Sequence, residues 1–96
     1  MTDINIKKIQ MEENMRRKNR EKCFEIIKNM CLKKIALVSK IGTANSVLFK
    51  VPPFILGQPS YDTEKCLQYL VKKMHKRGFK TMVIDKTNIL IYWQVL

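Results

Sequence analysis

The sequence contains few of the side chains that catalytic and metal sites require. It has one histidine, three cysteines and eight acidic residues among 96. His75 stands within the basic segment KKMHKR, where neighbouring positive charge disfavours the imidazolium form and no carboxylate is at hand to orient the ring. The three glycines are scattered, so no glycine-rich loop is present to cradle a phosphate group. We therefore expect neither an enzyme nor a bound cofactor.

The cysteines are too few and too widely spaced for a metal centre or a disulfide framework. Cys23, Cys31 and Cys66 are odd in number and lie within apolar patterns. Their spacings, alone or with His75, match no zinc-binding pattern, and an odd number does not suit a set of disulfides. We expect three small buried apolar side chains and no metal site.

Long apolar runs are also missing. No stretch approaches the roughly 20 apolar residues that cross a membrane, and the segment MTDINIKKIQMEEN has no apolar core of a secretory signal. A chain of 96 residues with 46% apolar side chains has the composition of one globular domain. We expect an intracellular protein without a membrane span.

Basic residues, in contrast, are abundant. Nineteen lysines and arginines against eight acidic residues give a formal charge of +11. Such a surplus favours nucleic acid, anionic lipid head groups or an acidic protein as partner. A lysine-rich surface also serves solubility, so the charge indicates a class of partner and not a function.

The first 41 residues contain neither glycine nor proline. From residue 23 onward apolar side chains recur at steps of three and four, which predicts a helix over about 12–39 that ends near Gly42. Residues 1–22 are then a basic, partly projecting helical arm, and residues 23–96 form a single α+β domain. The apolar stripe of the helix comprises Phe24, Ile27, Met30, Cys31, Leu32, Ile35 and Val38.

The second half of the chain alternates between strand and helix patterns. A strand is expected over 47–51, where Pro52 and Pro53 stop it. A helix is expected over 63–77, with Asp62 as its N-cap and Gly78 after its last turn. Two further strands, 79–84 and 89–95, form a hairpin. We expect Asn88 to take a positive φ at its tip.

These elements predict an α+β fold with two helices and a small three-stranded, mostly antiparallel sheet, for which a winged-helix-like arrangement is a candidate. The last strand is apolar on both faces, so it is either a central strand covered twice or one covered once with a partner on its other side. The apolar loop residues 54–56 are expected to plug one end of the core. An exposed docking patch is the alternative.

Two basic groups are the candidate nucleic-acid-binding residues. One lies in the N-terminal arm and the other on and just after the second helix, where the exposed face also carries Gln68. No aromatic and basic signature for stacking on single strands is evident, because Phe79, Tyr92 and Trp93 occupy core-like positions. A solvated helical face is the alternative interpretation of both groups. The candidate residues are Arg16, Arg17, Lys18, Arg20, Lys22, Lys65, Lys72, Lys73, Lys76, Arg77 and Lys80.

Four motifs carry a resemblance to a known group of proteins. They are VPPFILGQPSYD, CLQYL, RGF and NILIYW, all within 49–93. In these motifs the chain resembles a family of small uncharacterised proteins of nucleocytoplasmic large DNA viruses. The resemblance implies a viral protein of the virion or of the viral factory in the host cytoplasm, and it carries over no catalytic residue.

We therefore expect a basic, non-enzymatic viral protein associated with nucleic acid, either DNA or RNA. The alternative is a structural assembly protein, a minor capsid or scaffold component, that acts through contacts with other virion proteins or with its own copies. Basic groups gathered on one face would favour nucleic acid. An exposed apolar loop or an open apolar strand edge would favour assembly.

Overall fold

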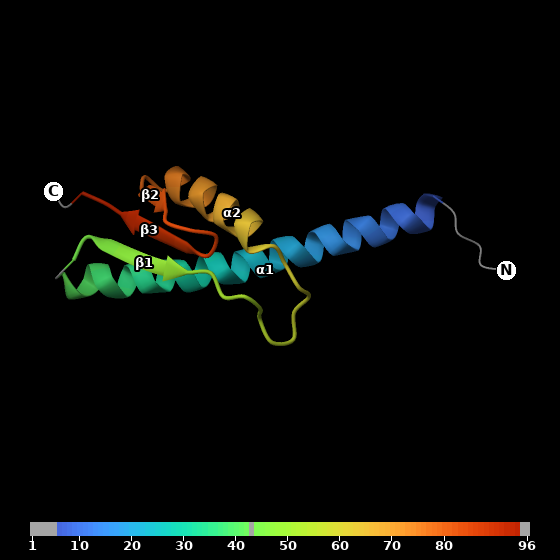
Figure 1. Ribbon diagram of the computed structural model, residues 1–96, viewed down its shortest axis with the longest axis horizontal. Coiled ribbons are helices and arrows are strands. Elements are labelled where there is room, and N and C mark those ends of the chain that lie inside the picture. Colours follow the sequence, from blue (N-terminus) through green and yellow to red (C-terminus); the bar gives the residue numbers. More distant parts are fainter. Residues whose placement is uncertain (1–5, 43, 95–96) are drawn as a thin grey trace.

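The computed structural model describes residues 6–42 and 44–94, apart from the side chains of Arg16 and Asn19. The chain forms an α+β fold with a long N-terminal helix and a small sheet (Figure 1), as the sequence predicts. The elements are α1 (Ile6–Ile41), β1 (Ser46–Lys50), α2 (Thr63–Lys76), β2 (Lys80–Val83) and β3 (Asn88–Tyr92).

Helix α1 is longer than predicted, because it begins at Ile6 and not near Glu12. Its 36 residues correspond to a length of about 54 Å at 1.5 Å per residue, which is most of the 65 Å length of the molecule. The helix ends at Ile41, and the next residue, Gly42, has a φ of +75°, which suits the left-handed position after a helix. The Gly42 N–H donates to the carbonyl of Val38 at 3.1 Å.

Only the second half of α1 takes part in the core. Burial begins at Cys23 and continues at every fourth residue through Ile27, Cys31 and Ile35. Met30 was expected on the same stripe, but it is 45% exposed because its neighbours in the helix take the inward-facing positions. The preceding segment, residues 6–22, buries none of its described side chains and extends past the rest of the molecule in Figure 1.

The sheet has the strand order β1-β3-β2, and both pairings are antiparallel. Its inner face carries Val47 and Phe49 of β1 opposite Ile91 and Ile89 of β3, and all four side chains are buried in the core that both helices share. Side chains alternate between the two faces of a strand. The helices therefore cover one face of the sheet and leave the other open.

A row of apolar side chains crosses the open face of the sheet. Leu48 pairs with Leu90, and Leu90 pairs with Met82 on the other side. Leu48 and Met82 are each 54% exposed. The last strand, β3, is therefore the central strand of the sheet. It is covered by the helices on one face only, and its other face is open to a partner.

The two outer edges of the sheet differ. The bonds from Val51 N to Thr87 O (2.7 Å) and from Trp93 N to Asn45 O (3.0 Å) extend the pairing of β1 with β3. Residues of an antiparallel strand point their N–H and C=O groups alternately towards and away from the neighbouring strand. The carbonyl of Leu48 is one that points away from β3, and Lys34 of α1 donates to it at 2.8 Å. A lysine ammonium thus occupies the β1 edge, while β2 forms the opposite edge.

Helix α2 has the predicted caps. The Asp62 carboxylate accepts hydrogen bonds from the N–H groups of Glu64 (2.9 Å) and Lys65 (3.4 Å), which have no partner within the helix. At the other end Gly78 has a φ of +87°, and the following N–H, of Phe79, donates to the carbonyl of Met74 at 3.1 Å. The side of α2 that faces the core buries Cys66, Leu67, Leu70 and Met74.

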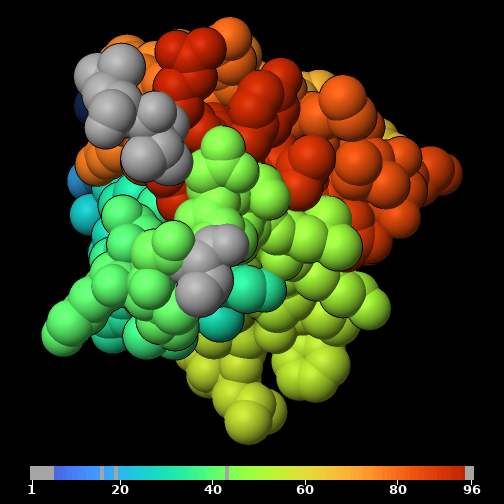
Figure 2. Space-filling model, turned by 90° about the vertical axis from the view of Figure 1, so that its left-hand side faces the viewer, coloured from blue at the N-terminus to red at the C-terminus, as the bar shows by residue number. Residues whose placement is uncertain are grey.

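The loop between β1 and α2 differs from the prediction. Ile55 packs against the core, but Phe54 is 65% and Leu56 88% exposed, so the expectation that all three residues plug the core is wrong. The loop protrudes from the body as the yellow-green segment at the bottom of Figure 2. No helix forms in this loop. A winged-helix domain has one there, so the winged-helix-like arrangement is limited to β1, α2 and the β2–β3 hairpin.

The tip of the hairpin is organised by Asp85. Its Oδ1 accepts hydrogen bonds from the N–H groups of Thr87 and Asn88, both at 2.8 Å, and the Asn88 amide binds both carboxylate oxygens. These hydrogen bonds lower the pKa of Asp85 to about 2. Among the described residues only glycines have a positive φ, so the prediction of a positive φ at Asn88 is wrong.

Candidate nucleic-acid interface

The outer face of α2 carries a stripe of exposed polar and basic side chains. Successive members are three or four residues apart, which places them on one side of a helix. This side lies opposite the buried Cys66, Leu70 and Met74. We call it the outer stripe of α2, and it consists of Lys65, Gln68, Lys72 and Lys76, all of them exposed.

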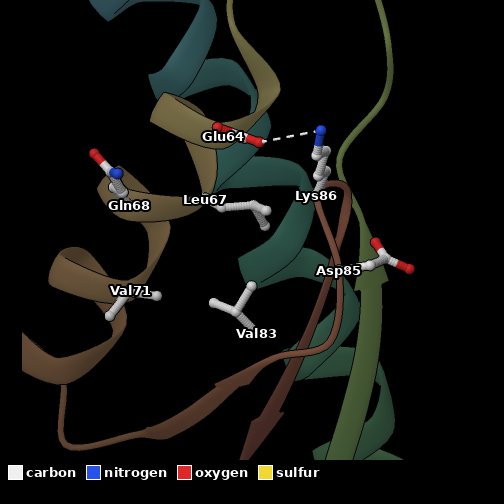
Figure 3. A pocket seen from close by; sticks show the side chains of 7 residues that line it. All are labelled: Glu64, Leu67, Gln68, Val71, Val83, Asp85 and Lys86. Atoms are coloured by element: carbon white, nitrogen blue, oxygen red, sulfur yellow. Dashed lines mark ion pairs between the residues drawn. The ribbon is translucent and has the colours of Figure 1, made fainter.

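The acidic residue of α2 borders this stripe, because Glu64 lies four residues before Gln68 and both line the hollow beside the hairpin. Its Oε1 points to the hairpin and lies 3.9 Å from the Nζ of Lys86 (Figure 3). The carboxylate of Glu64 is therefore paired with the hairpin and not with a lysine of the stripe. At 1.5 Å per residue, three lysines are spread over about 16 Å of helix.

A hollow of about 530 Å³ lies between α2 and the hairpin. Leu67 and Val71 of α2 approach Val83 across it, and Glu64 and Lys86 close one end (Figure 3). The lining is mainly apolar and its charged groups are of both signs. The hollow therefore adds little to the attraction of a polyanion.

Lys73 was predicted to belong to the basic cluster, but it lies apart from the outer stripe. Its Nζ is 5.4 Å from the centre of the Tyr69 ring, close enough for a cation–π interaction. Tyr69 in turn packs on Phe24 of α1, with ring centres 5.5 Å apart. Lys73 thus supports the contact between the two helices.

Arg77 and Lys80 lie at a second hollow, of about 640 Å³, between the end of α2 and the last three turns of α1. Trp93 and Gln94 line it from the end of β3, and Leu32 and Ile35 of α1 form part of its wall. Trp93 packs against the core, as its core-like position in the sequence predicts. It is only partly buried and shares the hollow with both cations, so an aromatic and basic combination is present that the sequence did not indicate.

The basic residues of the arm do not form a comparable face. Arg17 and Lys18 are adjacent and point about 100° apart around the helix axis, and both are exposed, as is Lys22. Arg20 is half-buried. Arg16 lies on α1, and its side chain is outside the described part of the structure.

The two basic groups also lie apart along the molecule. In Figure 1, α2 begins beside the middle of α1 and runs away from the N-terminal arm. Its basic end, with Lys76 and Arg77, is therefore the part of α2 furthest from the arm. The structure brings Lys65, Lys72 and Lys76 together and places Arg77 with Lys80, but it does not join either set to the arm.

The three cysteines lie buried and unbonded to one another. Burial raises the pKa of the Cys31 and Cys66 thiols to about 12, so they are not poised as nucleophiles. The Sγ of Cys23 donates to the carbonyl of Pro59 at 3.7 Å. Within residues 6–42 and 44–94 no three His, Cys, Asp or Glu side chains are grouped as metal ligands, and no helix there is long and apolar enough to cross a membrane.

Residues 4–75 match the model of a protein family described as a family of unknown function, DUF5759. The chain belongs to this family. The match covers the arm from residue 4 onward, all of α1, β1, the exposed loop and most of α2, and it ends before the hairpin. No curated protein and no solved structure matches the chain.

Proposed function

We propose that this member of the DUF5759 family is a non-enzymatic nucleic-acid-binding protein that uses the outer stripe of α2. The observation that carries the proposal is the set of three exposed lysines, Lys65, Lys72 and Lys76, aligned on one helical face. A helix of about 10–12 Å diameter fits the major groove of duplex DNA, which is about 12 Å wide. The hairpin stands beside the helix, with Lys86 at its exposed tip.

The sequence resemblance supports a viral setting for this proposed activity. The motifs shared with small proteins of nucleocytoplasmic large DNA viruses support a role in the virion or in the cytoplasmic viral factory. The net charge of +11 adds attraction to any polyanion at long range. It is the arrangement of lysines on α2, and not the charge alone, that supports a defined binding surface.

The test compares two triple variants of equal charge. K65Q/K72Q/K76Q removes the lysines of the outer stripe, and K7Q/K33Q/K50Q removes three exposed lysines elsewhere. Binding to labelled duplex and single-stranded DNA is measured over a salt series. If the stripe contacts three phosphates, its loss reduces the slope of log K against log salt by about 2.7. Between ~50 and ~200 mM salt, wild-type affinity then falls about 40-fold more than that of the stripe variant.

The control variant separates a defined surface from diffuse charge. We expect K7Q/K33Q/K50Q to retain most of the wild-type slope, because its lysines lie on α1 and β1, away from the stripe. Equal slopes for the two variants would show that binding follows net charge, and the outer stripe would then be rejected as the binding surface.

Assembly is a second candidate function, favoured by the exposed apolar groups. The open face of the sheet carries Leu48 and Met82, and the loop carries Phe54 and Leu56. By the criteria set out from the sequence, these groups favour contacts with other proteins or with further copies of the chain. Sedimentation velocity of wild type and L48S/M82S tests this function. The function is supported if the wild-type protein forms an oligomer and L48S/M82S is a monomer. If the wild-type protein is a monomer at all concentrations, self-assembly is rejected.

A further inference from the structure

The hollow between the end of α2 and the last turns of α1 combines an aromatic ring, two cations and an apolar wall. Its volume of about 640 Å³ lies within the range of roughly 300–1,000 Å³ found for small-molecule sites. It is separate from the outer stripe of α2, none of whose four residues lines it. The question is which chemical class of ligand would use all three features.

The aromatic component is Trp93, which is held in a defined orientation. The Phe79 ring lies edge-on to it, with centres 5.9 Å apart and an interplanar angle of 77°. The N–H of Trp93 donates to the carbonyl of Asn45 at 3.0 Å, which fixes its backbone. The side chain packs against the core and keeps part of its surface exposed, and it lines the hollow, which is the surface that a planar ligand would contact.

The charged components are Arg77 and Lys80, which are both exposed at the rim. The C-terminal end of α2 lies close by and carries about half a negative charge from its helix dipole. The two full positive charges of Arg77 and Lys80 exceed it. The Arg77 Nη1 is directed at the carbonyl of Lys73 at 3.4 Å, and the other N–H groups of the guanidinium remain to bind phosphate oxygens.

We propose that this hollow binds one unpaired nucleotide of a nucleic-acid strand, with the base against Trp93 and a phosphate at Arg77 and Lys80. Aromatic rings and basic side chains together are the features with which proteins hold single strands. The proposal rests on the nucleic-acid-binding function inferred above and adds that the substrate contains unpaired nucleotides.

The chain provides its own reporter for this site, because Trp93 is its one tryptophan. Its fluorescence is recorded during titration with oligothymidylate and with an abasic oligonucleotide of equal length. We expect the oligothymidylate to quench the emission strongly and the abasic strand to leave it nearly unchanged. R77Q/K80Q should raise the concentration for half-quenching at least tenfold, and K7Q/K50Q, with the same charge change, less than threefold.

A parallel anisotropy titration with labelled duplex and single-stranded DNA separates the two proposals. Strands that bind by anisotropy without changing Trp93 emission overturn the nucleotide site and leave the outer stripe in place. Equal quenching by the abasic strand also overturns it, since no base is then needed. Absence of binding to any strand overturns the nucleic-acid function itself. Both substituted side chains are exposed, so R77Q/K80Q should fold, which circular dichroism verifies.

Discussion

Two leucines, Leu70 and Leu56, provide a direct test of which apolar side chains hold the fold together. Leu70 on α2 is 0% exposed and Leu56 in the loop is 88% exposed. Truncating a fully buried leucine to alanine costs about 2–5 kcal/mol, because apolar contacts are lost and a cavity remains. Truncating an exposed leucine changes the free energy of unfolding by about 0.5 kcal/mol or less.

These values convert into widely different melting temperatures. For a domain of this size each kcal/mol shifts the Tm by about 4–8 °C. Leu70→Ala should therefore lower the Tm by roughly 10 °C or more, and Leu56→Ala by about 4 °C at most. If Leu70→Ala leaves too little folded protein, Ile27→Val, also at a fully buried position, should cost about 0.5–1.5 kcal/mol.

The assay is urea and thermal unfolding followed by circular dichroism. A shift of the urea midpoint at constant slope reports a change of stability alone. A loss of 2 kcal/mol or more in Leu56→Ala would refute the reasoning, because the loop would then plug the core as the sequence first suggested. A negligible loss would leave Leu56 without a folding role and available for contacts with another molecule.

Three further predictions concern the caps, the thiols and the hairpin tip. Asp62→Ala should lower the free energy of unfolding by about 1 kcal/mol, since two N–H groups of α2 lose their acceptor; an unchanged urea midpoint would contradict the cap. A thiol reagent should modify Cys23, Cys31 and Cys66 in denaturant but only slowly in the native protein, because all three are buried; rapid native labelling would contradict that burial. Because the pKa of Asp85 is lowered from 3.8 to about 2, its stabilisation is complete above about pH 4 and is lost as the pH falls through about 2. Asp85→Asn should weaken this acid dependence, which urea midpoints at several pH values would measure.

The sequence predicted the regular elements because their signals are local. Asp62 and Gly78 mark the ends of α2, and the alternation in 47–51 indicates which face of that strand meets the core. Residues 89–93 are apolar on both faces, so their pattern identifies a strand but not its inner face. The start of α1 was predicted too late. A polar segment without glycine or proline can continue a helix, but it packs against nothing and therefore has no apolar periodicity from which the helix could be recognised. The exposure of Phe54 and Leu56 was not predicted for another reason. A short apolar segment between prolines is compatible both with a loop that packs into the core and with an exposed loop.

The candidate site was predictable only in part. The spacing of Lys65, Lys72 and Lys76 is enough to place them on one face of a helix. The position of Lys73 over Tyr69 depends on how α2 packs against α1, which no local pattern contains. The hollow at Trp93 joins residues from both helices and the last strand, so only the tertiary structure reveals it.

The unequal edges of the sheet limit how copies of this protein can join. Strand β1 has the ammonium of Lys34 at its outer carbonyl, and a lysine at this position obstructs an incoming strand. If a second chain adds to the sheet, it does so at β2. A unit with one usable edge can pair with the same edge of a second copy about a two-fold axis, and the pair then has no usable edge left. Strand addition in this protein would accordingly stop at two copies, whereas two usable edges would let it continue into a fibre.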